Sequence, residues 1–412
     1  MLRSMFSAIS GLRAHQTKMD VTGNNIANVN TVGFKASQTV FQDTLSQVIR
    51  AGGAPAADRG GTNPAQVGLG AKVAAITTNW TQGATQSTGR STDFMIEGDG
   101  FFVTRGTGGE QLFTRAGSFD FDGAGKLVTP DGAVLQGWMA APGTGVVNTN
   151  GPIGNLSVPY GQLVNPTATT SGIVKGNLPS DAAVGAKVQT GITMYDSQGV
   201  AQKVFYNFEK TAENTWDVSV DHADGTSLLA ATEIEFDTDG TMIDPTGPDF
   251  ELPAFTPPAA YTSWQNPVTV SIGGVSQFGG TNTLSAPEQD GYALGSLQSF
   301  QLGADGTIMG VYSNELRQPI GRLALASFNN PGGLEKAGNS SFRVGVNSGV
   351  AQVGTAAEGG RGALMSGALE MSNVDLAEEF TGLIVAQRGF QANSRVITSS
   401  DEILQDLVNL KR

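Results

Sequence analysis

The hydrophobic pattern of the chain differs between its two ends and its middle. Near both ends, apolar side chains recur every seven residues, whereas in between they alternate with polar ones over short runs. A seven-residue repeat places apolar side chains along one side of a helix at the coiled-coil period, and alternation places them on one face of a strand. The pattern therefore predicts an α+β, mainly β protein in which two long terminal helices flank a β-rich middle.

The two helical ends are predicted to pair with each other and with neighbouring chains. Residues 1–30 carry a formal charge of +2 and residues 370–412 one of −3, and a bias of opposite sign helps to select partners. The alternative is that both helices pack onto one globular core. The first apolar repeat is weakest at Gln16 and Gly23. The repeats consist of Leu2 and Ile9; of Met5, Leu12, Met19 and Ile26; and of Leu376, Leu383, Phe390, Ile397 and Leu404, widened by Phe380, Ile384, Ile403, Leu407 and Leu410.

The last helix carries signals for both of its ends. Ser372 or Asn373 is expected to cap it, and the helix should then run about 38 residues, or ~57 Å. Acidic residues follow the cap and two basic residues end the chain, an order that complements the helix dipole. Gly382 and Gly389 each cost about 1 kcal/mol relative to alanine inside a helix. They indicate either close approach of another helix or a need for bending.

The stretch "NNIANVNTVGFK" (Asn24–Lys35) places four asparagines within seven positions. Asparagine favours caps and turns, because its amide competes for local backbone hydrogen bonds. A capped helix followed by a turn at Gly33 is one account. However, Ile26 continues the apolar repeat, so the helix is expected to end near residues 28–30. In the account that we favour, the amides offer uncharged donors and acceptors to neighbouring chains; they are Asn24, Asn25, Asn28 and Asn30.

One pattern recurs three times in the β-rich middle. It reads "FDFDGAGKL" (119–127), "IEFDTDGTM" (234–242) and "FQLGADGTI" (300–308). Each copy alternates, passes through Asp and Gly, and resumes alternation, which predicts a hairpin with glycine where φ is positive. The Asp pairs only loosely suggest calcium loops, because none has the twelve-residue ligand spacing that ends in Glu.

Stretches rich in Gly, Ala and Pro suggest a nested domain layout. Residues 1–30 and 372–412 form the predicted terminal helical domain, and residues 31–70 and 350–371 form extended connecting segments. An inner β domain is expected from residues 71–145 and 290–349. An inserted outer β domain is expected from residues 146–289.

Composition excludes several classes of protein. The 412 residues include 56 glycines and no cysteine, which excludes disulfides, Cys-ligated metals and thiol nucleophiles. The net charge of −13 argues against nucleic-acid binding and against adsorption to anionic lipid. We find no apolar run long enough to span a membrane and no cleavable signal peptide.

No catalytic, metal or cofactor site is predicted. The two histidines, His15 and His222, lie in no nucleophile motif, and no phosphate-binding or dinucleotide-binding glycine motif occurs. A pair of carboxylates could serve a glycosidase, but no pattern marks one. Four tryptophans in four predicted strand regions could form a sugar-stacking surface, although core packing is the better interpretation; they are Trp80, Trp138, Trp216 and Trp264.

Three segments resemble one protein family. "SAISGLRAHQTKMDVTGNNIANVNTVGFKASQTVFQDTL" and "GALEMSNVDLAEEFTGLIVAQRGFQANSRVITSSDEILQDLVNL" are similar to the terminal motifs of bacterial flagellar axial proteins, the rod and hook family. "STDFMIEGDGFFVT" resembles a β segment of the same proteins. The motifs cover about a quarter of the chain and are specific. The large central insertion, "TMYDSQGVAQKVFYNFEK" and "SNELRQPIGRLALASFNNPGGL" resemble the hook members rather than the shorter rod members.

The resemblance implies a structural subunit that is exported uncleaved and unfolded by the flagellar type III apparatus. It implies head-to-tail assembly into a curved, flexible hollow tube outside the cell, which couples rod to filament and transmits torque. Partners would be copies of the chain, the distal rod protein, the hook cap and the hook–filament junction proteins. No cofactor, nucleic acid or membrane insertion is implied. The predicted assembly interface comprises Leu2, Met5, Ile9, Leu12, Met19, Asn24, Asn25, Ile26, Asn28, Asn30, Gly33, Phe34, Leu376, Phe380, Leu383, Gly389, Phe390, Ile397, Leu404 and Leu407.

Two other functions stay open at this point. A distal rod protein would share the terminal motifs and form a straight tube. A secreted β-rich adhesin or glycan-binding protein would bind ligand through its central domain and form no polymer, but it does not explain the matched repeats at the two ends.

Overall fold

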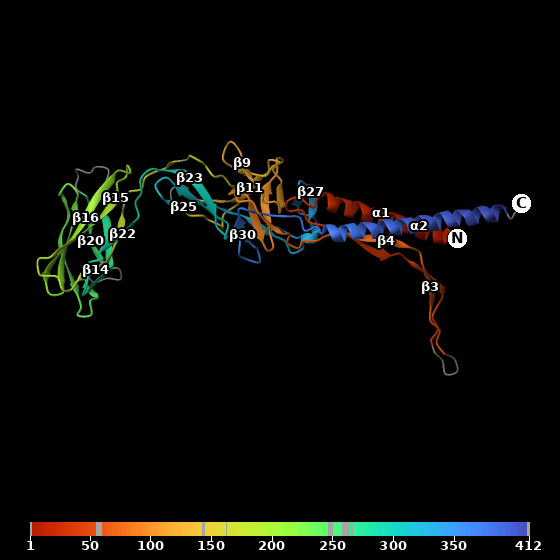
Figure 1. The fold of residues 1–412 in the computed structure, drawn as a ribbon, viewed down its shortest axis with the longest axis horizontal. Helices are drawn as coiled ribbons and strands as arrows, with labels where there is room; N and C mark the ends of the chain where they lie inside the picture. Colours follow the sequence, from red (N-terminus) through yellow and green to blue (C-terminus); the bar gives the residue numbers. More distant parts are fainter. Residues whose placement is uncertain are drawn as a thin grey trace.

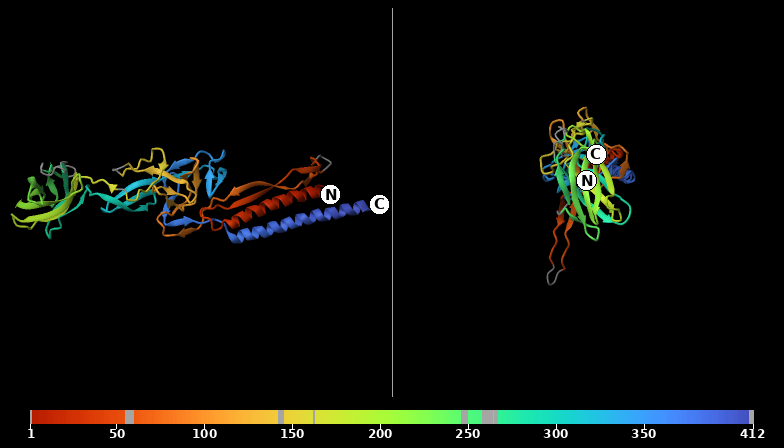
Figure 2. Two further views of the ribbon diagram at one scale, coloured as in Figure 1. Left: turned by 90° about the horizontal axis from the view of Figure 1, so that it is seen from above. Right: turned by 90° about the vertical axis from the view of Figure 1, so that its left-hand side faces the viewer.

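The computed structural model describes residues 2–54, 60–141, 145–161, 163–245, 250–257, 264 and 267–409. The molecule is elongated, and its two ends lie together at one extremity (Figure 1). A helix pair, an inner β domain and an outer β domain follow one another along its length (Figure 2). The predicted mainly β fold with two long terminal helices is confirmed.

Helices α1 (Leu2–Ala27) and α2 (Leu376–Asn409) lie side by side. The predicted cap of α2 is wrong: the carboxylate of Asp375 accepts the N–H groups of Ala377 at 2.8 Å and of Glu378 at 3.2 Å. Asn373 is unable to cap because its side chain is bonded elsewhere. The described helix is 34 residues long, somewhat shorter than expected.

A long β-hairpin follows α1. Strand β1 (Ser37–Asp43) pairs with β4 (Ala71–Thr78), and β2 (Ser46–Arg50) pairs with β3 (Ala65–Gly68), both antiparallel. The hairpin runs beside the helices and its outer half projects away from them (Figure 1). Residues 31–70 thus contain paired strands in place of the predicted extended connection, and β4 belongs to this hairpin and not to the inner domain as predicted. Pairing along the hairpin ladder instead satisfies the backbone groups of both segments.

The inner β domain is built from both flanks of the chain. Its main sheet has the order β13-β23-β24-β25-β11-β7-β8-β28-β27. In the core of this domain the fully buried ring of Phe119 meets that of Phe102 edge-on at 5.3 Å. The strands before the outer domain are β5 (Thr85–Ser87), β6 (Phe94–Glu97), β7 (Phe101–Arg105), β8 (Gln111–Thr114), β9 (Asp120–Phe121), β10 (Leu127–Val128), β11 (Val134–Met139), β12 (Gly154–Asn155) and β13 (Leu163–Val164).

The strands after the outer domain complete the inner one. Residues 350–371, expected to be a connection, contain three of these strands: β30 pairs with β6, β31 with β5, and β29 with β26. Ala356 and Leu364 lie in the inner core, which explains why this segment is held there. The strands are β23 (Gly295–Leu302), β24 (Thr307–Tyr312), β25 (Arg317–Leu323), β26 (Leu325–Ser327), β27 (Glu335–Gly338), β28 (Ser341–Arg343), β29 (Gln352–Gly354), β30 (Ala363–Ser366) and β31 (Ala368–Glu370), with a 3-10 turn at Pro331–Gly333.

The outer β domain is a sandwich of two sheets with the orders β20-β21-β14-β22 and β15-β16-β17-β18-β19. Its separate core includes Phe208 and Trp216, both fully buried. Residues 154–164, expected in this domain, pair with the inner sheet because Leu156 and Val158 fill the inner core. The strands are β14 (Ser171–Pro179), β15 (Lys187–Tyr195), β16 (Ala201–Ala212), β17 (Thr215–His222), β18 (Ser227–Phe236), β19 (Met242–Asp244), β20 (Glu251–Phe255), β21 (Val268–Phe278) and β22 (Ser285–Gln289).

The chain crosses between the two β domains twice, and the two crossings are paired. Thr167 and Tyr292 exchange two backbone hydrogen bonds of 3.0 Å. At the outer end the carboxylate of Asp290 accepts the N–H groups of Thr170 and Ser171 at 2.8 and 2.9 Å. We call residues 165–170 and 290–294 the neck.

The three predicted Asp-Gly hairpins are confirmed. They join β9 to β10, β18 to β19 and β23 to β24, each as an antiparallel pair. The glycine of each motif has a positive φ, of 75° at Gly125, 75° at Gly240 and 85° at Gly306. Glycine adopts this conformation at little steric cost, which accounts for its position in the repeated pattern.

Candidate assembly surfaces and the joint between the chain ends

The two terminal helices approach each other closely at two glycines. A Cβ atom on Gly11 would come within 2.9 Å of the amide of Asn393, and one on Gly389 within 2.6 Å of the imidazole of His15. Nothing lies within 4 Å of a Cβ built on Gly382. Gly389 therefore serves close helix approach, which is one of the two expected reasons, and Gly382 does not.

The predicted apolar repeats lie between and beside the helices, and the chain alone buries them only in part. Leu376 and Phe380 are exposed. Leu2 and Leu407 belong to the helical backbone, but their side chains lie outside the described part of the chain, as does all of Leu410. The half-buried members are Met5, Ile9, Leu12, Met19, Ile26, Leu383, Phe390, Ile397 and Leu404.

Further apolar side chains of the helices have no cover within the chain. Phe6 on α1 is 68% exposed, and α2 presents Phe380, Ile384, Val385 and Ile403 to the surroundings. A run of exposed apolar residues of this kind typically marks an interaction surface. We call the exposed set on α2 the open face of α2.

The long hairpin carries a second exposed apolar surface, which was not among the predicted assembly residues. Leu45 is 81% exposed, and Val48, Ile49, Val67 and Leu69 are exposed as well. The Gly, Ala and Pro residues between the strands are typical of an extended connection, so the sequence did not predict a hairpin here. The alternation of Val67 and Leu69 with polar or glycine positions was the available signal.

Three of the four asparagines form side-chain hydrogen bonds within the chain. Asn25 is buried: its amide nitrogen donates to Ser37 O at 2.8 Å and to Glu379 Oε1 at 2.7 Å, and its oxygen accepts the N–H of Ser37. The amide of Asn28 donates to the backbone oxygen of Asn24 at 2.9 Å. A local role thus accounts for Asn25 and Asn28. Asn24 and Asn30 are exposed, and the side-chain oxygen of Asn24 accepts the amide of Asn28 at 3.2 Å.

Gly33 and Phe34 lie where α1 meets the inner domain. Gly33 has a φ of 66°, and a Cβ there would come within 2.5 Å of the backbone nitrogen of Ala116. Its N–H donates to Glu370 O at 2.8 Å. The ammonium of Lys336 lies 5.5 Å from the centre of the half-buried Phe34 ring. Both residues therefore fix the chain against the inner domain.

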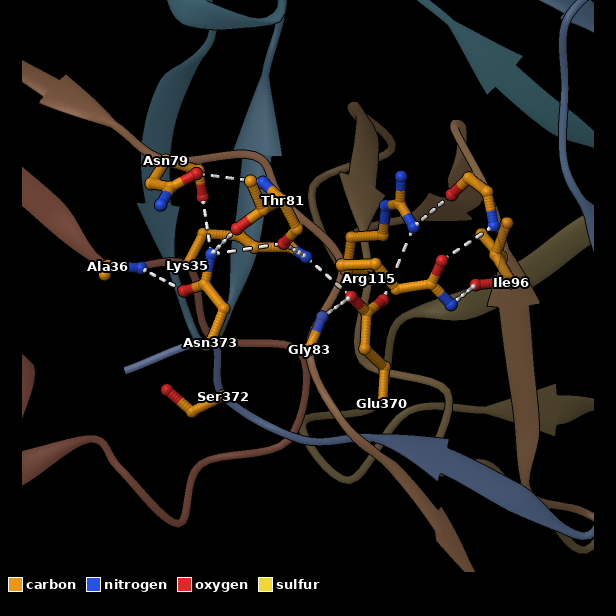
Figure 3. A network of polar contacts seen from close by, with 12 residues as sticks. Lys35, Ala36, Asn79, Thr81, Gly83, Ile96, Arg115, Glu370, Ser372 and Asn373 are labelled. Carbon is orange, nitrogen blue, oxygen red and sulfur yellow. Dashed lines mark hydrogen bonds and ion pairs between the residues drawn. The ribbon is translucent and has the colours of Figure 1, made fainter. Parts of the chain in front are cut away.

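A buried charged cluster joins the two chain ends to the inner domain (Figure 3). The ammonium of Lys35 lies 2.6 Å from Glu370 Oε1 and donates to Thr81 O at 2.7 Å. The guanidinium of Arg115 lies 3.4 Å from Glu370 Oε2 and donates to Gly98 O at 2.8 Å. The side chains of Lys35 and Glu370 are fully buried, and that of Arg115 is 4% exposed. We call these three residues the joint.

Neutral side chains continue this network. The oxygen of Asn373 accepts the N–H of Ala36 at 2.8 Å, and its nitrogen donates to Asn79 O at 2.9 Å and to Thr81 O at 3.1 Å. Gln82 accepts the N–H of Gly98 at 3.1 Å. The segments that leave the two helices are thus held by side chains on both sides of the joint.

Burial sets the electrostatics of the joint. It lowers the pKa of Lys35, while the hydrogen bond and charge of Glu370 act in the opposite direction. Burial likewise lowers the pKa of Arg115, and Glu370 again opposes it. Glu370 is therefore the main group that stabilises both buried cations in their charged forms, and the charge of Asp99 acts in the same direction.

The described residues contain no group of three or more His, Asp or Glu side chains that could hold a metal ion. No helix among them is long and apolar enough to cross a membrane. Trp138, Trp216 and Trp264 are buried, as their predicted core role requires. Trp80 is half-buried and packs edge-on against the ring of Phe101 at 5.2 Å.

Four family descriptions match successive parts of the chain. Residues 5–35 match "Flagella basal body rod protein" and residues 365–410 match "Flagellar basal body rod FlgEFG protein C-terminal". Residues 95–176 match "Flagellar hook protein FlgE/F/G D1 domain", and residues 167–292 match "Flagellar basal body protein FlaE D2 domain". These matches include most of the terminal helices, the outer β domain and the first part of the inner β domain.

Relatives similar over the whole length include flagellar hook proteins and a flagellar basal-body rod protein, FlgG of Bacillus subtilis, which is 35% identical over 100% of both chains. The flagellar hook protein FlgE of Borreliella burgdorferi is 40% identical and that of Treponema pallidum 38% identical, each covering 100% of both chains. The crystal structure of Helicobacter pylori flagellar hook protein FlgE2 shares the fold, with a TM-score of 0.55 and 14% identity over 69% of this chain and 100% of that one. The chain belongs to the flagellar hook protein FlgE family, a family of structural subunits of the bacterial flagellar hook.

Proposed function

We propose that copies of this chain assemble head to tail into the curved, flexible hollow tube that couples the flagellar rod to the filament and transmits torque. The observation that supports this most is the helix pair, whose apolar repeats are half-buried and whose open face has no cover within the chain. Neighbouring copies can bury these side chains. Where two different surfaces of one molecule meet and the rotation does not close, the product is an open helical polymer.

We further propose a radial order within that tube. The helix pairs would line the inner core, the inner β domains would form the wall, and the outer β domains would lie at the surface. The linear order of these parts in the molecule supports this arrangement (Figure 2). The outer domain has a complete core of its own around Phe208 and Trp216, so it needs no neighbour in order to fold.

The composition of the wall suits bending. A curved tube that rotates must let neighbouring subunits slide at low energetic cost. The chain is rich in glycine, and only 15% of its residues are charged. Such surfaces present few strong, directional ion pairs that would fix one register between copies.

The proposed partners follow from membership of the family. They are copies of the chain, the distal rod protein, the hook cap, the hook–filament junction proteins and the type III export apparatus, with export requiring no cleaved signal peptide. The role is structural, and we propose no catalytic activity, cofactor, nucleic-acid partner or membrane insertion.

Substitutions on the open face of α2 test the proposal. Phe380→Ser combined with Ile384→Ser removes two exposed apolar side chains, so it should leave the isolated chain folded and reduce its polymerisation. Gln387→Ser, an exposed polar change on the same helix, is the matched control. Sedimentation of concentrated protein measures the extent of polymerisation, and electron microscopy shows the shape of the product. Unchanged polymerisation of the double variant would contradict the proposed interface, and straight tubes from the parent chain would indicate a rod protein.

We also propose that the helices become ordered during assembly. In the isolated chain their apolar repeats are only half-buried, so packing stabilises the helices little. In dilute solution, amides of α1 and α2 should exchange rapidly, whereas those of β30 and β31 should exchange slowly because these strands belong to the inner domain. Strong protection of both helices in the dilute chain would count against this proposal. Removing residues 376–412 should abolish polymerisation and leave both β domains folded.

A further inference from the structure

The joint brings together three charged residues from distant parts of the chain. Lys35 follows α1, Arg115 lies between β8 and β9, and Glu370 is the last residue of β31. Lys35 and Glu370 are 335 positions apart in the sequence. Among the ion pairs of the described residues, these two contacts are buried, whereas the ion pair of Arg343 with Glu335 is well exposed on both sides.

The joint contains two positive charges and one negative charge, so its stability depends most on the single carboxylate, that of Glu370. Two cations share a single carboxylate, which also accepts the N–H of Gly83 at 2.9 Å. Without Lys35, the carboxylate would still have Arg115. Without the carboxylate, both cations would be left buried with backbone carbonyls as their principal partners, and an uncompensated buried charge is strongly destabilising.

The joint also lies where the helices leave the inner domain. Glu370 stands six residues before the start of α2 at Leu376, and Lys35 stands between the end of α1 and the start of β1. The backbone oxygen of Glu370 accepts the N–H of Gly33, and its side chain holds Lys35. Glu370 thus ties both exit segments to the inner domain and to each other (Figure 3).

We infer that Glu370 is the positioning residue that fixes the terminal helix pair on the inner β domain, and that the joint closes as a latch when the C-terminal segment reaches the N-terminal one. Until that segment arrives, β5 and β6 lack their partners β31 and β30, and two cations lack their carboxylate. A chain with an incomplete end therefore lacks the contacts that hold the segment after α1, and with them the orientation that α1 takes once the helices are ordered. The latch itself concerns the folded single chain. In a growing tube it would let only complete subunits present a correctly placed helix pair, and this second role rests on the proposed function.

Hydrogen exchange of full-length Glu370→Gln tests the latch without any polymer. Glutamine keeps the size of the side chain and an acceptor for Gly83, but it removes the charge. We expect protection of the amides of Gly33 and Ala36 to fall by about a hundredfold or more. Amides of Phe208 and Val218 in the outer domain should keep their protection. Glu335→Gln, which removes an exposed partner of Arg343 in the same inner domain, should change neither group.

Lys35→Met provides the second, decisive comparison. Because Glu370 then retains Arg115, this variant should lose clearly less protection at Gly33 and Ala36 than Glu370→Gln does. An equal or larger loss would overturn the assignment of Glu370 as the positioning residue. So would unchanged protection in Glu370→Gln. If Glu370→Gln fails to fold, Lys35→Met still decides: a folded chain with partial loss supports the ordering, and a similar failure contradicts it.

The orientation of α2 relative to the inner domain can be measured directly. A general loss of stability would not by itself change this orientation. The chain has no cysteine, so Gln387→Cys on α2 and Ala124→Cys on the inner domain introduce unique sites for spin labels. Labelled chains are assembled with a large excess of unlabelled parent. We expect a narrow distance distribution in the parent background and a broader one with Glu370→Gln, whereas an equally narrow one would overturn the positioning role. Failure of the parent chain itself to form tubes would refute the proposed function and leave the exchange experiment on the single chain to decide the latch.

Discussion

Alanine substitutions at two glycines of α2 measure how tightly the helices pack. Inside a helix, alanine is favoured over glycine by about 1 kcal/mol. Gly382→Ala should realise this gain, because nothing lies within 4 Å of the new methyl group. At Gly389 the methyl group would come within 2.6 Å of the His15 imidazole, so the ring must move. The ring has limited room, since its centre lies 5.8 Å from that of Phe41.

We therefore expect Gly389→Ala to be about 1 kcal/mol less stabilising than Gly382→Ala, because displacement of the ring cancels the gain in helix propensity. In a His15→Ala background the imidazole is absent, so Gly389→Ala should stabilise the helix by the full gain in helix propensity of about 1 kcal/mol. The resulting double-mutant cycle should show a coupling of about 1 kcal/mol between positions 15 and 389.

Thermal loss of helicity in assembled protein, followed by far-UV circular dichroism, provides the measurement. Concentration must be the same for all variants, because assembly makes the melting temperature depend on it. Equal stabilisation by Gly382→Ala and Gly389→Ala in the parent background would refute the reasoning, since it would mean that the helices do not approach at Gly389.

Three further changes probe other parts of the molecule. Gly33→Ala forces a side chain into a left-handed conformation against backbone of the inner domain, and should lower the free energy of unfolding by about 2 kcal/mol or more in denaturant titrations. Phe208→Ala should destabilise the outer domain by about 3–5 kcal/mol and leave the calorimetric transition of the inner domain unchanged. Burial raises the pKa of Asp290, but hydrogen bonds from Thr170 and Ser171 outweigh it and hold that pKa below its usual range. The stability that Asp290 supplies is thus complete above its ordinary pKa and lost as the pH falls through the lowered one, and Asp290→Asn should remove this acid dependence in unfolding measured against pH.

For each of these three changes, one result would contradict the prediction. Gly23→Ala, at an open helical position, is the control for Gly33→Ala and should not destabilise the chain. Similar effects at the two glycines would contradict the account of Gly33. A shift of both transitions by Phe208→Ala would show that the two domains unfold together. An unchanged acid limb in Asp290→Asn would assign the acid dependence to other carboxylates.

The sequence predicted those features that depend on local periodicity. The seven-residue repeats identified both helices, and the Asp-Gly motifs identified three hairpins with glycines such as Gly125 at positive φ. These succeed because helix, strand and turn each impose a short, regular requirement on neighbouring residues.

Features that depend on contacts between distant segments could not be predicted. Asn373 looks like a helix cap, but the backbone of residues 79 and 81 occupies its amide, and Asp375 caps α2 instead. Asn25 looks like an assembly contact until Ser37 and Glu379 are placed beside it. Lys35 and Glu370 each resemble an ordinary surface charge in the sequence, and only the fold shows that they are a buried pair.

The paired neck makes the middle of the chain replaceable. Because Thr167 and Tyr292 are directly hydrogen-bonded neighbours, the two ends of the segment between them already stand as close as the flanks of a tight turn. A short loop, or a foreign domain with adjacent termini, could be grafted there without moving the inner domain or the helices. The size and chemistry of the outer β domain can thus diverge during evolution, or be redesigned for display, independently of the inner domain and the helix pair.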